Sequence, residues 1–531
     1  MKKINELAVL IECSGGSTPT VDTLKKYIRM LSQMGYDQLY LGCTDAFKME
    51  NEPYFNYKRG GYDTASLREL DAYAAEHGIE LIASIQTLAH LHYLKKYNVY
   101  TPLFDTDNVL LVGDERVYTL IDHMFAAISE GIKSRRIHIG FDEAFGIGTG
   151  RYLKLHGYRP KRELMAEHLR EVVKIAAKYG YTCEIWGDMF TEEKDGKKYI
   201  PEEVKDAIPE GVRLILWDYN ECDRSKLRGL LAEGKRACGK LSYAGAAYKI
   251  CGFAPSNGYS ISRIVPQLDA CQESGVGQYI VTLWADGGGL CSIFAVLPAV
   301  FATAEYALGN WDGRGKPDAK KFLRITGVPY DTMYSLDYLN DPFRKNLTTL
   351  NSRSYWILYS DILLGNYDSY LSEGTGEAYE KLAGFYRKQR AGEYAYLFET
   401  AAALAQLLSV KAELGLHVRD AYAKGDKERL QSLLDKEFPV LERGLKKFER
   451  LYEKQWLIEN FCFGLEVVQL FLGGQILRYR YVKDRIRGYV RDDEKIGELE
   501  GAWLPPCIIR PIDEDACLEM NYRNLISYCG I

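Results

Sequence analysis

Short apolar runs alternate with amphipathic helical stretches from the N-terminus to about residue 310, and this alternation restricts the possible folds more than any other feature. Each run has the length of a buried strand. Glycines such as Gly35, Gly78 and Gly180 mark turns from a helix into the next strand. The expected strands lie at residues 7–12, 37–42, 79–86, 137–143, 182–186, 212–217, 241–247 and 278–284.

Eight strand–helix units predict an α/β fold of the TIM (β/α)8 barrel type, in which eight parallel strands close on themselves. The competing fold is a doubly wound open sheet, which does not require eight strand–helix units. That fold usually carries a Gly-x-Gly-x-x-Gly motif after its first strand, and the motif is absent there in this chain. The sequence therefore favours the barrel.

Beyond about residue 316 the pattern changes to helices alone. Leu407, Leu414 and Val418 fall on one helical face, and a second long helix carries its own apolar stripe from Leu430 to Phe448. Gly425-Asp426 marks the turn between the two helices. We expect two domains, a barrel over residues 1–316 and an all-α C-terminal domain over residues 317–531. The apolar stripes need a partner surface, either the barrel or the second copy in a homodimer.

Charge and composition exclude several classes of protein. The net charge of −5 with no long basic run argues against a nucleic-acid or membrane-surface partner, and the longest apolar region, 291–308, is interrupted by polar residues and a proline. The polar N-terminus does not resemble a signal peptide, so we expect a cytoplasmic protein with reduced thiols. The eight histidines show no metal-ligand spacing, and we expect neither a metal nor an organic cofactor.

Polar and aromatic side chains recur where each expected strand ends. Barrel active sites are assembled from these C-terminal strand ends, because packing occupies the barrel interior and the lower face. A single Trp at such a position is commonly a core residue, but three of them here are each followed within two residues by an Asp. The residues at the strand ends are Glu12, Asp45, Gln86, His90, Asp142, Glu143, Trp186, Asp188, Trp217, Asp218, Tyr219, Tyr248, Trp284 and Asp286.

The fourth strand carries the most chemistry. Its apolar run begins at Ile137 and ends in the adjacent carboxylates Asp142 and Glu143, and the glycine-rich segment 144–150 that follows favours a loop. The alternative is a helix N-terminus with two acidic residues near its dipole. A strand that delivers two carboxylates into a loop is typical of a catalytic barrel.

An acidic pair among several tryptophans suits a carbohydrate, because indole faces cover the apolar faces of a pyranose and carboxylates accept hydrogen bonds from its hydroxyls. Hydrolysis of a glycosidic bond needs a carboxylic acid for the leaving oxygen and a nucleophile or base, ordinarily a second carboxylate across the ring. Adjacent carboxylates cannot easily straddle a sugar. They can act together if a 2-acetamido group of the substrate supplies the nucleophile.

Several motifs carry a resemblance to a known family. His138-x-Gly140-x-Asp142-Glu143 resembles the signature of family 20 glycoside hydrolases, the exo-β-N-acetylhexosaminidases. Gln86-Thr87-Leu88-Ala89-His90 is similar to the third-strand motif of that family, and Trp186-Gly187-Asp188 and Trp284-Ala285-Asp286 are similar to its fifth- and eighth-strand ends. The segments 51–55 and 463–466 resemble a bacterial subgroup with a helical C-terminal domain.

By this resemblance Glu143 is the general acid and base, Asp142 orients the acetamide, and Tyr219 donates to its carbonyl. The resemblance also implies a sugar pocket formed by Gln86, His90, His138, Trp186, Asp188, Trp217, Tyr248, Trp284 and Asp286. His138 can equally be an internal hydrogen-bonding residue, His90 a support of the barrel, and Tyr248 a packing residue. Two positions depart from the family pattern, because Glu12-Cys13-Ser14 stands where many members have an Arg and Tyr248 stands where a Trp is expected.

The resulting hypothesis is a bacterial exo-acting enzyme that removes terminal β-linked GlcNAc, GalNAc or both by a retaining, substrate-assisted mechanism. Its partner would be a glycan with a terminal N-acetylhexosamine. Two alternatives remain open. One is a sugar-binding barrel without turnover, and the other is a two-carboxylate retaining glycosidase acting on sugars that lack the acetamide.

Overall fold

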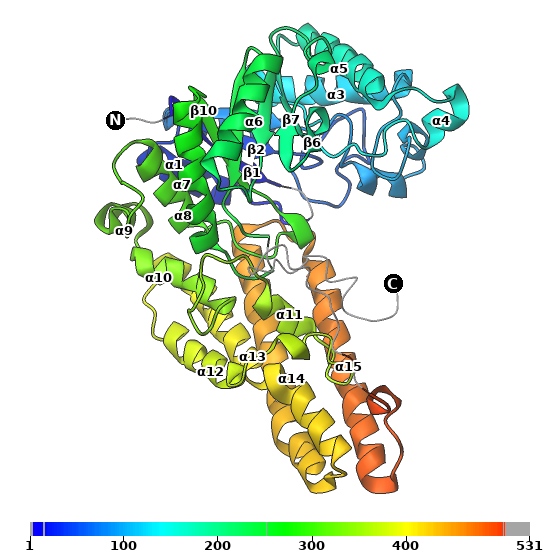
Figure 1. Cartoon of the computed structure of the whole chain (residues 1–531), viewed down its shortest axis with the longest axis vertical. Helices are drawn as coiled ribbons and strands as arrows, with labels where there is room; N and C mark the ends of the chain where they lie inside the picture. The colour runs from blue at the N-terminus through cyan, green and yellow to red at the C-terminus, as the bar shows by residue number, and fades with distance from the viewer. Residues whose placement is uncertain (1–3, 14–15, 251, 503, 505–531) are drawn as a thin grey trace. The chain divides into compact units, whose positions relative to one another are not determined.

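The computed structural model describes residues 4–13, 16–250, 252–502 and 504. Within them eight parallel strands close into a barrel in the order β1-β10-β9-β8-β5-β4-β3-β2, which confirms the predicted fold class (Figure 1). The barrel strands are β1 Glu6–Glu12, β2 Gln38–Gly42, β3 Glu80–Ser84, β4 Arg136–His138, β5 Thr182–Trp186, β8 Arg213–Trp217, β9 Leu241–Ala246 and β10 Gln278–Leu283.

The barrel helices begin at side-chain caps that the sequence supplies. Thr20, Asp63 and Asp114 each accept a hydrogen bond from a backbone N–H in the first turn of the following helix. The helices of this region are α1 Val21–Met34, α2 Thr64–Glu76, α3 Glu115–Gly131, α4 Arg151–His156, α5 Lys161–Lys178, α6 Arg224–Ala237, α7 Asn257–Glu273 and α8 Leu297–Ala307. The short helix α4 and a hairpin, β6 Glu192–Lys194 with β7 Lys197–Tyr199, were not predicted from the sequence.

Side chains fill the barrel interior, so it is a packed core rather than a channel. At its N-terminal end the Arg136 guanidinium contacts the buried Glu184 carboxylate at 2.8 Å, and the Tyr40 hydroxyl donates to the same carboxylate at 2.6 Å. Toward the other end Trp217, Tyr219 and Trp284 lie against the core. The fully buried core residues are Ala8, Leu10, Tyr40, Ile82, Trp186, Ile215, Ala244 and Ile280.

The described residues form two compact units. The barrel unit contains the chain up to Ala247 with Ser260–Ala285 and Val300–Asp318, and the helical unit contains Tyr248–Tyr259, Asp286–Ala299 and the chain from Ala319 onward. Two short segments of the barrel region therefore cluster with the C-terminal helices. The domain division at residues 316 and 317 stays a prediction.

The helical unit is built on consecutive antiparallel helices, of which α12, α13, α14 and α15 pack each against the next (Figure 1). Gly425, with φ +66°, lies in the predicted turn between α13 and α14, and Asp426 caps α14. The helices are α9 Ala319–Thr326, α10 Tyr330–Tyr334, α11 Arg353–Tyr359, α12 Thr375–Tyr386, α13 Ala395–Ala423, α14 Lys427–Glu459 and α15 Leu465–Asp492.

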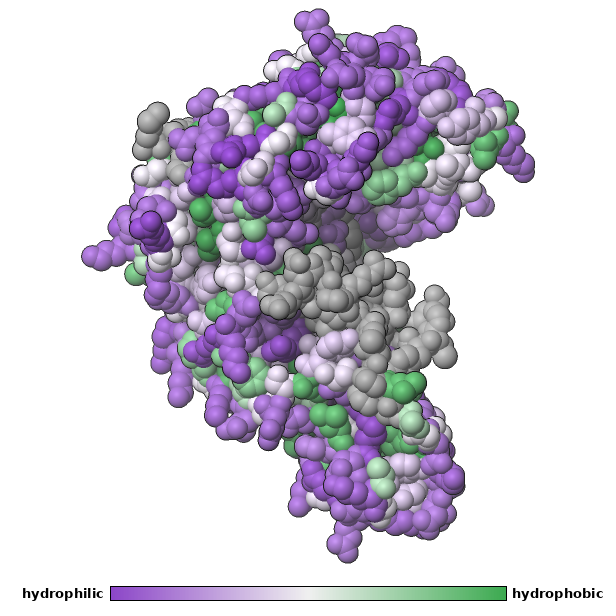
Figure 2. Space-filling model, viewed as in Figure 1, coloured by the Kyte–Doolittle hydropathy of each residue, from purple (hydrophilic) through white to green (hydrophobic). Residues whose placement is uncertain are grey.

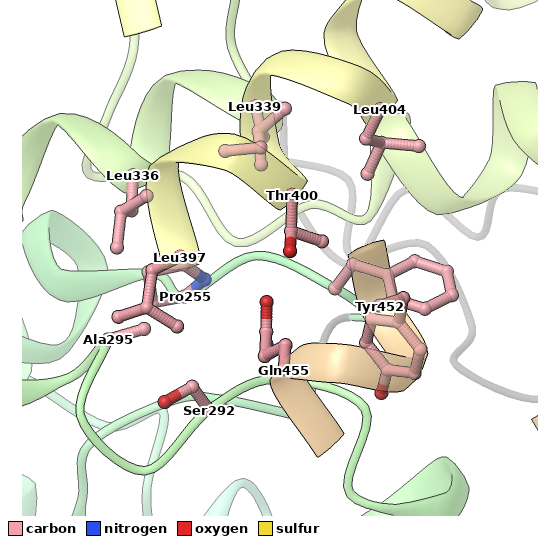
Figure 3. A pocket seen from close by; sticks show the side chains of 12 residues that line it. Pro255, Ser292, Ala295, Leu336, Leu339, Leu397, Thr400, Leu404, Tyr452 and Gln455 are labelled. Carbon is pink, nitrogen blue, oxygen red and sulfur yellow. The ribbon is translucent and has the colours of Figure 1, made fainter. Parts of the chain in front are cut away.

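A small cavity lies inside the helical unit, between α13, α14 and the segments 253–255 and 292–295 (Figure 3). Leu336, Leu397 and Leu404 are among its lining residues, and Gln455 is one of the few polar ones. Its volume of about 20 Å³ is enough for a single water molecule, so it cannot hold a sugar.

Candidate active site

The turn after β4 places the two carboxylates at the C-terminal end of the barrel. Gly140, Phe141 and Glu143 all have positive φ, at 77°, 77° and 52°, so the chain leaves the strand direction at once. A Cβ atom at Gly140 would lie 2.0 Å from the Gln86 Oε1 atom, which only glycine avoids. The tight turn brings the loop after β3 against the loop after β4.

Asp142 is held by two side chains from the loop after β3. The Gln86 Nε2 group donates to Asp142 Oδ1 at 3.1 Å, and His90 Nε2 lies 3.3 Å from Asp142 Oδ2. Burial opposes the charged form of Asp142, but the His90 cation and the Gln86 amide outweigh it and lower the pKa of this carboxyl. Asp142 is therefore ionised at neutral pH.

His90 lies between the two carboxylates. Its Nε2 atom is 3.7 Å from Glu143 Oε2, and its own backbone N–H donates to Asn108 Oδ1 at 2.9 Å, which holds a residue with φ +61° in place. Burial would lower the pKa of His90, but Asp142 and Glu143 raise it to about 9. The imidazole is therefore a cation at neutral pH.

Glu143 differs from Asp142 in exposure and in acidity. Its side chain is 47% exposed, against 14% for Asp142. Partial burial, together with the neighbouring Asp142 charge, raises the pKa of Glu143 although His90 opposes the shift. Two adjacent carboxyl groups with opposite pKa shifts can serve as a charged group and a proton donor, respectively.

Asp188, which follows β5, supports the turn from the other side. Its Oδ2 atom accepts from the Glu143 backbone N–H at 2.9 Å, and its Oδ1 atom accepts from Trp217 Nε1 at 3.4 Å. Burial and the charge of Asp142 raise the pKa of Asp188 to about 7. In this structure Asp188 positions the general-acid candidate, and its predicted contact with a sugar hydroxyl stays a prediction.

Aromatic rings form a wall next to these carboxylates. The ring centroids of Trp186 and Trp284 are 5.7 Å apart, those of Tyr219 and Trp284 are 6.5 Å apart, and Trp217 stacks on Tyr219 at 4.9 Å. Trp186 is almost fully buried, whereas the other three are partly exposed. The structure thus brings together four of the aromatic residues that the sequence singled out.

His138 lies behind the site, fully buried. Its Nδ1 atom accepts from the Gly140 backbone N–H at 3.1 Å, and its ring packs on Trp186 with centroids 4.5 Å apart. Burial lowers the pKa of His138 to about 4, so the ring is neutral. This geometry favours the internal hydrogen-bonding alternative.

Tyr248 and Asp286 belong to the helical unit, although each follows a barrel strand closely. Tyr248 is buried and meets the Tyr259 ring edge-on, with centroids 5.0 Å apart, whereas Asp286 is exposed. Their predicted roles in the sugar pocket stay predictions.

Two other strand-end carboxylates have partners within the barrel unit. Asp45 is buried and pairs with Arg59, and Glu12 Oε2 accepts from the Ala285 backbone N–H at 2.5 Å. Sequence reasoning missed Asn108, which holds His90. It lies 18 residues further along in an irregular loop, where no periodic signal marks it.

Among the residues described, no group of three His, Cys, Asp or Glu side chains gathers at metal-binding distance. None of the described helices is both long and apolar enough to cross a membrane. The chemistry that the described site can supply is that of two carboxyl groups, a cationic imidazole and an aromatic wall.

Comparisons with known proteins agree with this arrangement. Residues 20–238 match the model of the glycosyl hydrolase family 20 catalytic domain, and residues 331–510 match that of the glycoside hydrolase 20C C-terminal domain. The chain belongs to glycoside hydrolase family 20. The predicted family membership is therefore confirmed.

Individual relatives are distant. Human hexosaminidase D is 24% identical over 247 residues, which cover 44% of this chain and 49% of the human protein. The chain thus spans about half the length of that relative. A β-N-acetylhexosaminidase structure from Bacteroides fragilis has 16% identity and a TM-score of 0.45, covering 61% of this chain and 69% of that one. The chitobiase of Flavobacterium johnsoniae has 14% identity and a TM-score of 0.47, covering 93% and 73%.

Proposed function

We propose that this chain is an exo-acting β-N-acetylhexosaminidase that removes terminal non-reducing β-linked GlcNAc, GalNAc or both. The carrying observation is the adjacent pair after β4, in which the pKa of Asp142 is lowered and the pKa of Glu143 is raised. The pair suits a substrate that brings its own nucleophile, because both carboxyl groups come from one turn rather than from opposite sides of a sugar ring.

In the first step Glu143 gives its proton to the leaving glycosidic oxygen while the acetamide carbonyl oxygen of the substrate attacks the anomeric carbon. The bond to the leaving group breaks, and an oxazolinium ring forms within the sugar. Asp142 accepts a hydrogen bond from the acetamide N–H. Its negative charge stabilises the transition state more than the bound substrate, because the nitrogen gains positive charge as the ring forms. The internal nucleophile is already near its target, which avoids the entropy cost of a second molecule.

In the second step Glu143, now ionised, takes a proton from a water molecule, whose oxygen attacks the anomeric carbon and reopens the ring. Each step inverts the configuration at the anomeric carbon, so the product has the same configuration as the substrate. Tyr219 would donate to the acetamide carbonyl, and Trp186, Trp217 and Trp284 would surround the acetamide and sugar. Gln86, His90 and Asp188 would hold the carboxylates and contact hydroxyls.

The function is tested by measuring how fast the wild type and Glu143→Gln hydrolyse the nitrophenyl β-glycosides of GlcNAc, GalNAc, glucose and galactose. The rate of chitobiose hydrolysis is measured alongside. General acid catalysis is worth roughly 10²–10⁴-fold. We expect this loss on chitobiose and a much smaller one on the nitrophenyl substrates, whose leaving groups need little protonation. Glu130→Gln, an exposed change on α3, is the matched control and should leave both rates unchanged.

The nucleophile is tested by fluorinating the acetyl methyl group of the nitrophenyl substrate stepwise, which weakens the acetamide oxygen as a nucleophile. We expect the rate to fall steeply with each fluorine, and more shallowly in Asp142→Ala. Equal activity on glucosides, or a trapped covalent sugar on a carboxylate, would favour a two-carboxylate glycosidase. Turnover no faster than in Glu143→Gln on every substrate would favour a sugar-binding barrel.

We also propose that residues 1–316 form the catalytic domain and 317–531 the helical domain, and that the bacterial cytoplasm is the compartment. The cytoplasmic proposal is supported by cysteine chemistry, since the eight cysteines among the described residues are free thiols.

A homodimer is the remaining proposal, and α15 supports it. Val467, Leu470, Leu477 and Tyr481 are 41%, 74%, 59% and 42% exposed and recur at helical spacing, with Gly474 in the middle. The opposite face of α15 is buried within the helical unit. Figure 2 shows hydrophobic side chains in this part of the molecule. We name these five residues the α15 stripe and propose that it packs antiparallel against the same stripe of a second copy.

A further inference from the structure

Two long loops carry a group of exposed aromatic rings that the proposed chemistry does not use. Tyr54 and Tyr57 lie in the loop after β2 and are 47% and 51% exposed, and Tyr97 lies in the loop after β3 and is half-buried. The two loops leave the barrel at the C-terminal ends of the neighbouring strands β2 and β3, and β3 pairs with β4, which carries the carboxylates. We name these three residues the tyrosine platform.

The three rings of the platform pack against one another. Tyr54 stacks on Tyr97 with centroids 5.2 Å apart and planes at 29°, and Tyr57 meets both rings at 6.1 and 6.5 Å. The Tyr97 hydroxyl donates to the Tyr57 carbonyl oxygen at 3.3 Å, which ties one loop to the other. Lys58 Nζ lies 5.9 Å from the Tyr57 ring centroid.

Further contacts between the two loops hold them in place. Arg59 pairs with the buried Asp45 and lies over the Tyr93 ring at 4.3 Å, so it joins the loop after β2 to the loop after β3. The Tyr100 hydroxyl donates to Glu52 Oε2 at 2.9 Å. A platform fixed in this way loses little side-chain freedom when a ligand covers it, which favours binding.

The platform and the catalytic carboxylates share one segment of chain. His90 contacts Asp142 and Glu143, and the 3-10 helix η1 (His92–Lys96) leads from His90 directly to Tyr97. Its five residues rise about 2.0 Å each, so they carry the chain roughly 10 Å away. A single sugar at the carboxylates would not cover the platform, whereas a longer glycan leaving from the Glu143 side could extend onto it.

We propose that the tyrosine platform binds the sugars of the leaving glycan chain beyond the one joined to the scissile bond. The inference rests on the proposed function and deepens it, because it makes oligosaccharide chains rather than short glycosides the preferred substrate class. Tyrosine faces cover the apolar faces of pyranoses, and phenolic hydroxyls exchange hydrogen bonds with sugar hydroxyls.

The test compares kcat/KM for β-1,4-linked N-acetylglucosamine oligomers of two to six units with that for the nitrophenyl acetamido glycoside. With the wild type we expect kcat/KM to rise with chain length. In Tyr54→Ala/Tyr57→Ala we expect a loss of about 3- to 10-fold for each ring on the longest oligomers, mostly as a higher KM. The nitrophenyl glycoside should be cleaved as before.

Two variants separate ring stacking from a folding effect. Tyr54→Phe/Tyr57→Phe keeps the rings and should retain most of the length dependence, and Tyr158→Ala removes a tyrosine that is 80% exposed in another loop and should change nothing. A wild type without length dependence, or a double alanine variant with unchanged oligomer rates, would overturn the platform. A variant that loses the same factor on the nitrophenyl glycoside would overturn it as well. Failure of the wild type to cleave any acetamido glycoside would instead reject the proposed function.

Discussion

His90 controls the charge balance of the candidate site at the scale of single residues. Its cation lies within 4 Å of both carboxylates, and the Asn108 side chain fixes its backbone in the left-handed region. The positive charge lowers the pKa of Asp142 and opposes the rise in the pKa of Glu143. One histidine thus sets the pH window in which Asp142 is charged and Glu143 is protonated.

We predict that His90→Asn moves the whole bell-shaped pH profile of kcat/KM to higher pH. Removal of a nearby cation favours the protonated form of each carboxyl, so both pKa values rise. The acid limb, set by ionisation of Asp142, and the alkaline limb, set by loss of the Glu143 proton, therefore shift in the same direction. Asparagine tolerates the positive φ of this position.

The measurement is kcat/KM on chitobiose between pH 3 and 9, because its leaving group needs the Glu143 proton. His156→Asn, an exposed histidine on α4, is the control and should leave the profile in place. A His90→Asn profile with unmoved limbs, or with limbs that move apart, would contradict this account of the charge balance.

At the scale of elements, the turn after β4 determines how the loops after β3 and β4 meet. Gly140 has φ +77° and leaves room for Gln86, whose amide holds Asp142. His138 accepts a hydrogen bond from the same glycine N–H. The turn therefore couples a backbone conformation to the position of a proposed catalytic carboxylate.

We predict that Gly140→Ala lowers kcat roughly 10²-fold. The new methyl group would displace Gln86, and Asp142, which Gln86 holds, would shift slightly out of its catalytic position. Gly157→Ala is a matched control, since Gly157 also has φ +77° and a Cβ there meets no atom within 4 Å. Both variants should lose about 1–3 kcal/mol of unfolding free energy, because an L side chain is strained at these positive φ values. Equal activity of the two variants in kcat measurements would show that the space beside Gln86 is unimportant.

At the scale of the whole molecule, the α15 stripe is the feature that points beyond a single chain. Val467 and Tyr481 lie seven residues on either side of Gly474, so two antiparallel copies of α15 would pair each with the other. Leu470 and Leu477 lie four and three residues from Gly474, so Leu470 of one copy would lie near Leu477 of the other.

We predict that Leu470→Glu/Leu477→Glu converts the protein from dimer to monomer in sedimentation equilibrium, because four charges would enter an apolar contact. A monomeric wild type would exclude the dimer.

Local sequence patterns determined the barrel and the position of its chemistry. Strand-length apolar runs and helical periodicity are properties of neighbouring residues, so eight units, the turn at Gly425 and the family membership could be predicted without coordinates. The Asp142-Glu143 pair was visible for the same reason, since it directly follows one such run. The short α4 helix and the β6–β7 hairpin were missed because their periodic signals are too brief.

Only the tertiary structure decided what the strand-end residues do for one another. The contact of His90 with Asp142, the hold of Asp188 on the Glu143 backbone and the pairing of Asp45 with Arg59 join residues far apart in the chain. The opposite pKa shifts of Asp142 and Glu143 likewise depend on burial and neighbouring charge, which no local pattern encodes. The sequence therefore identified the carboxylates, and the fold distinguished the charged one from the proton donor.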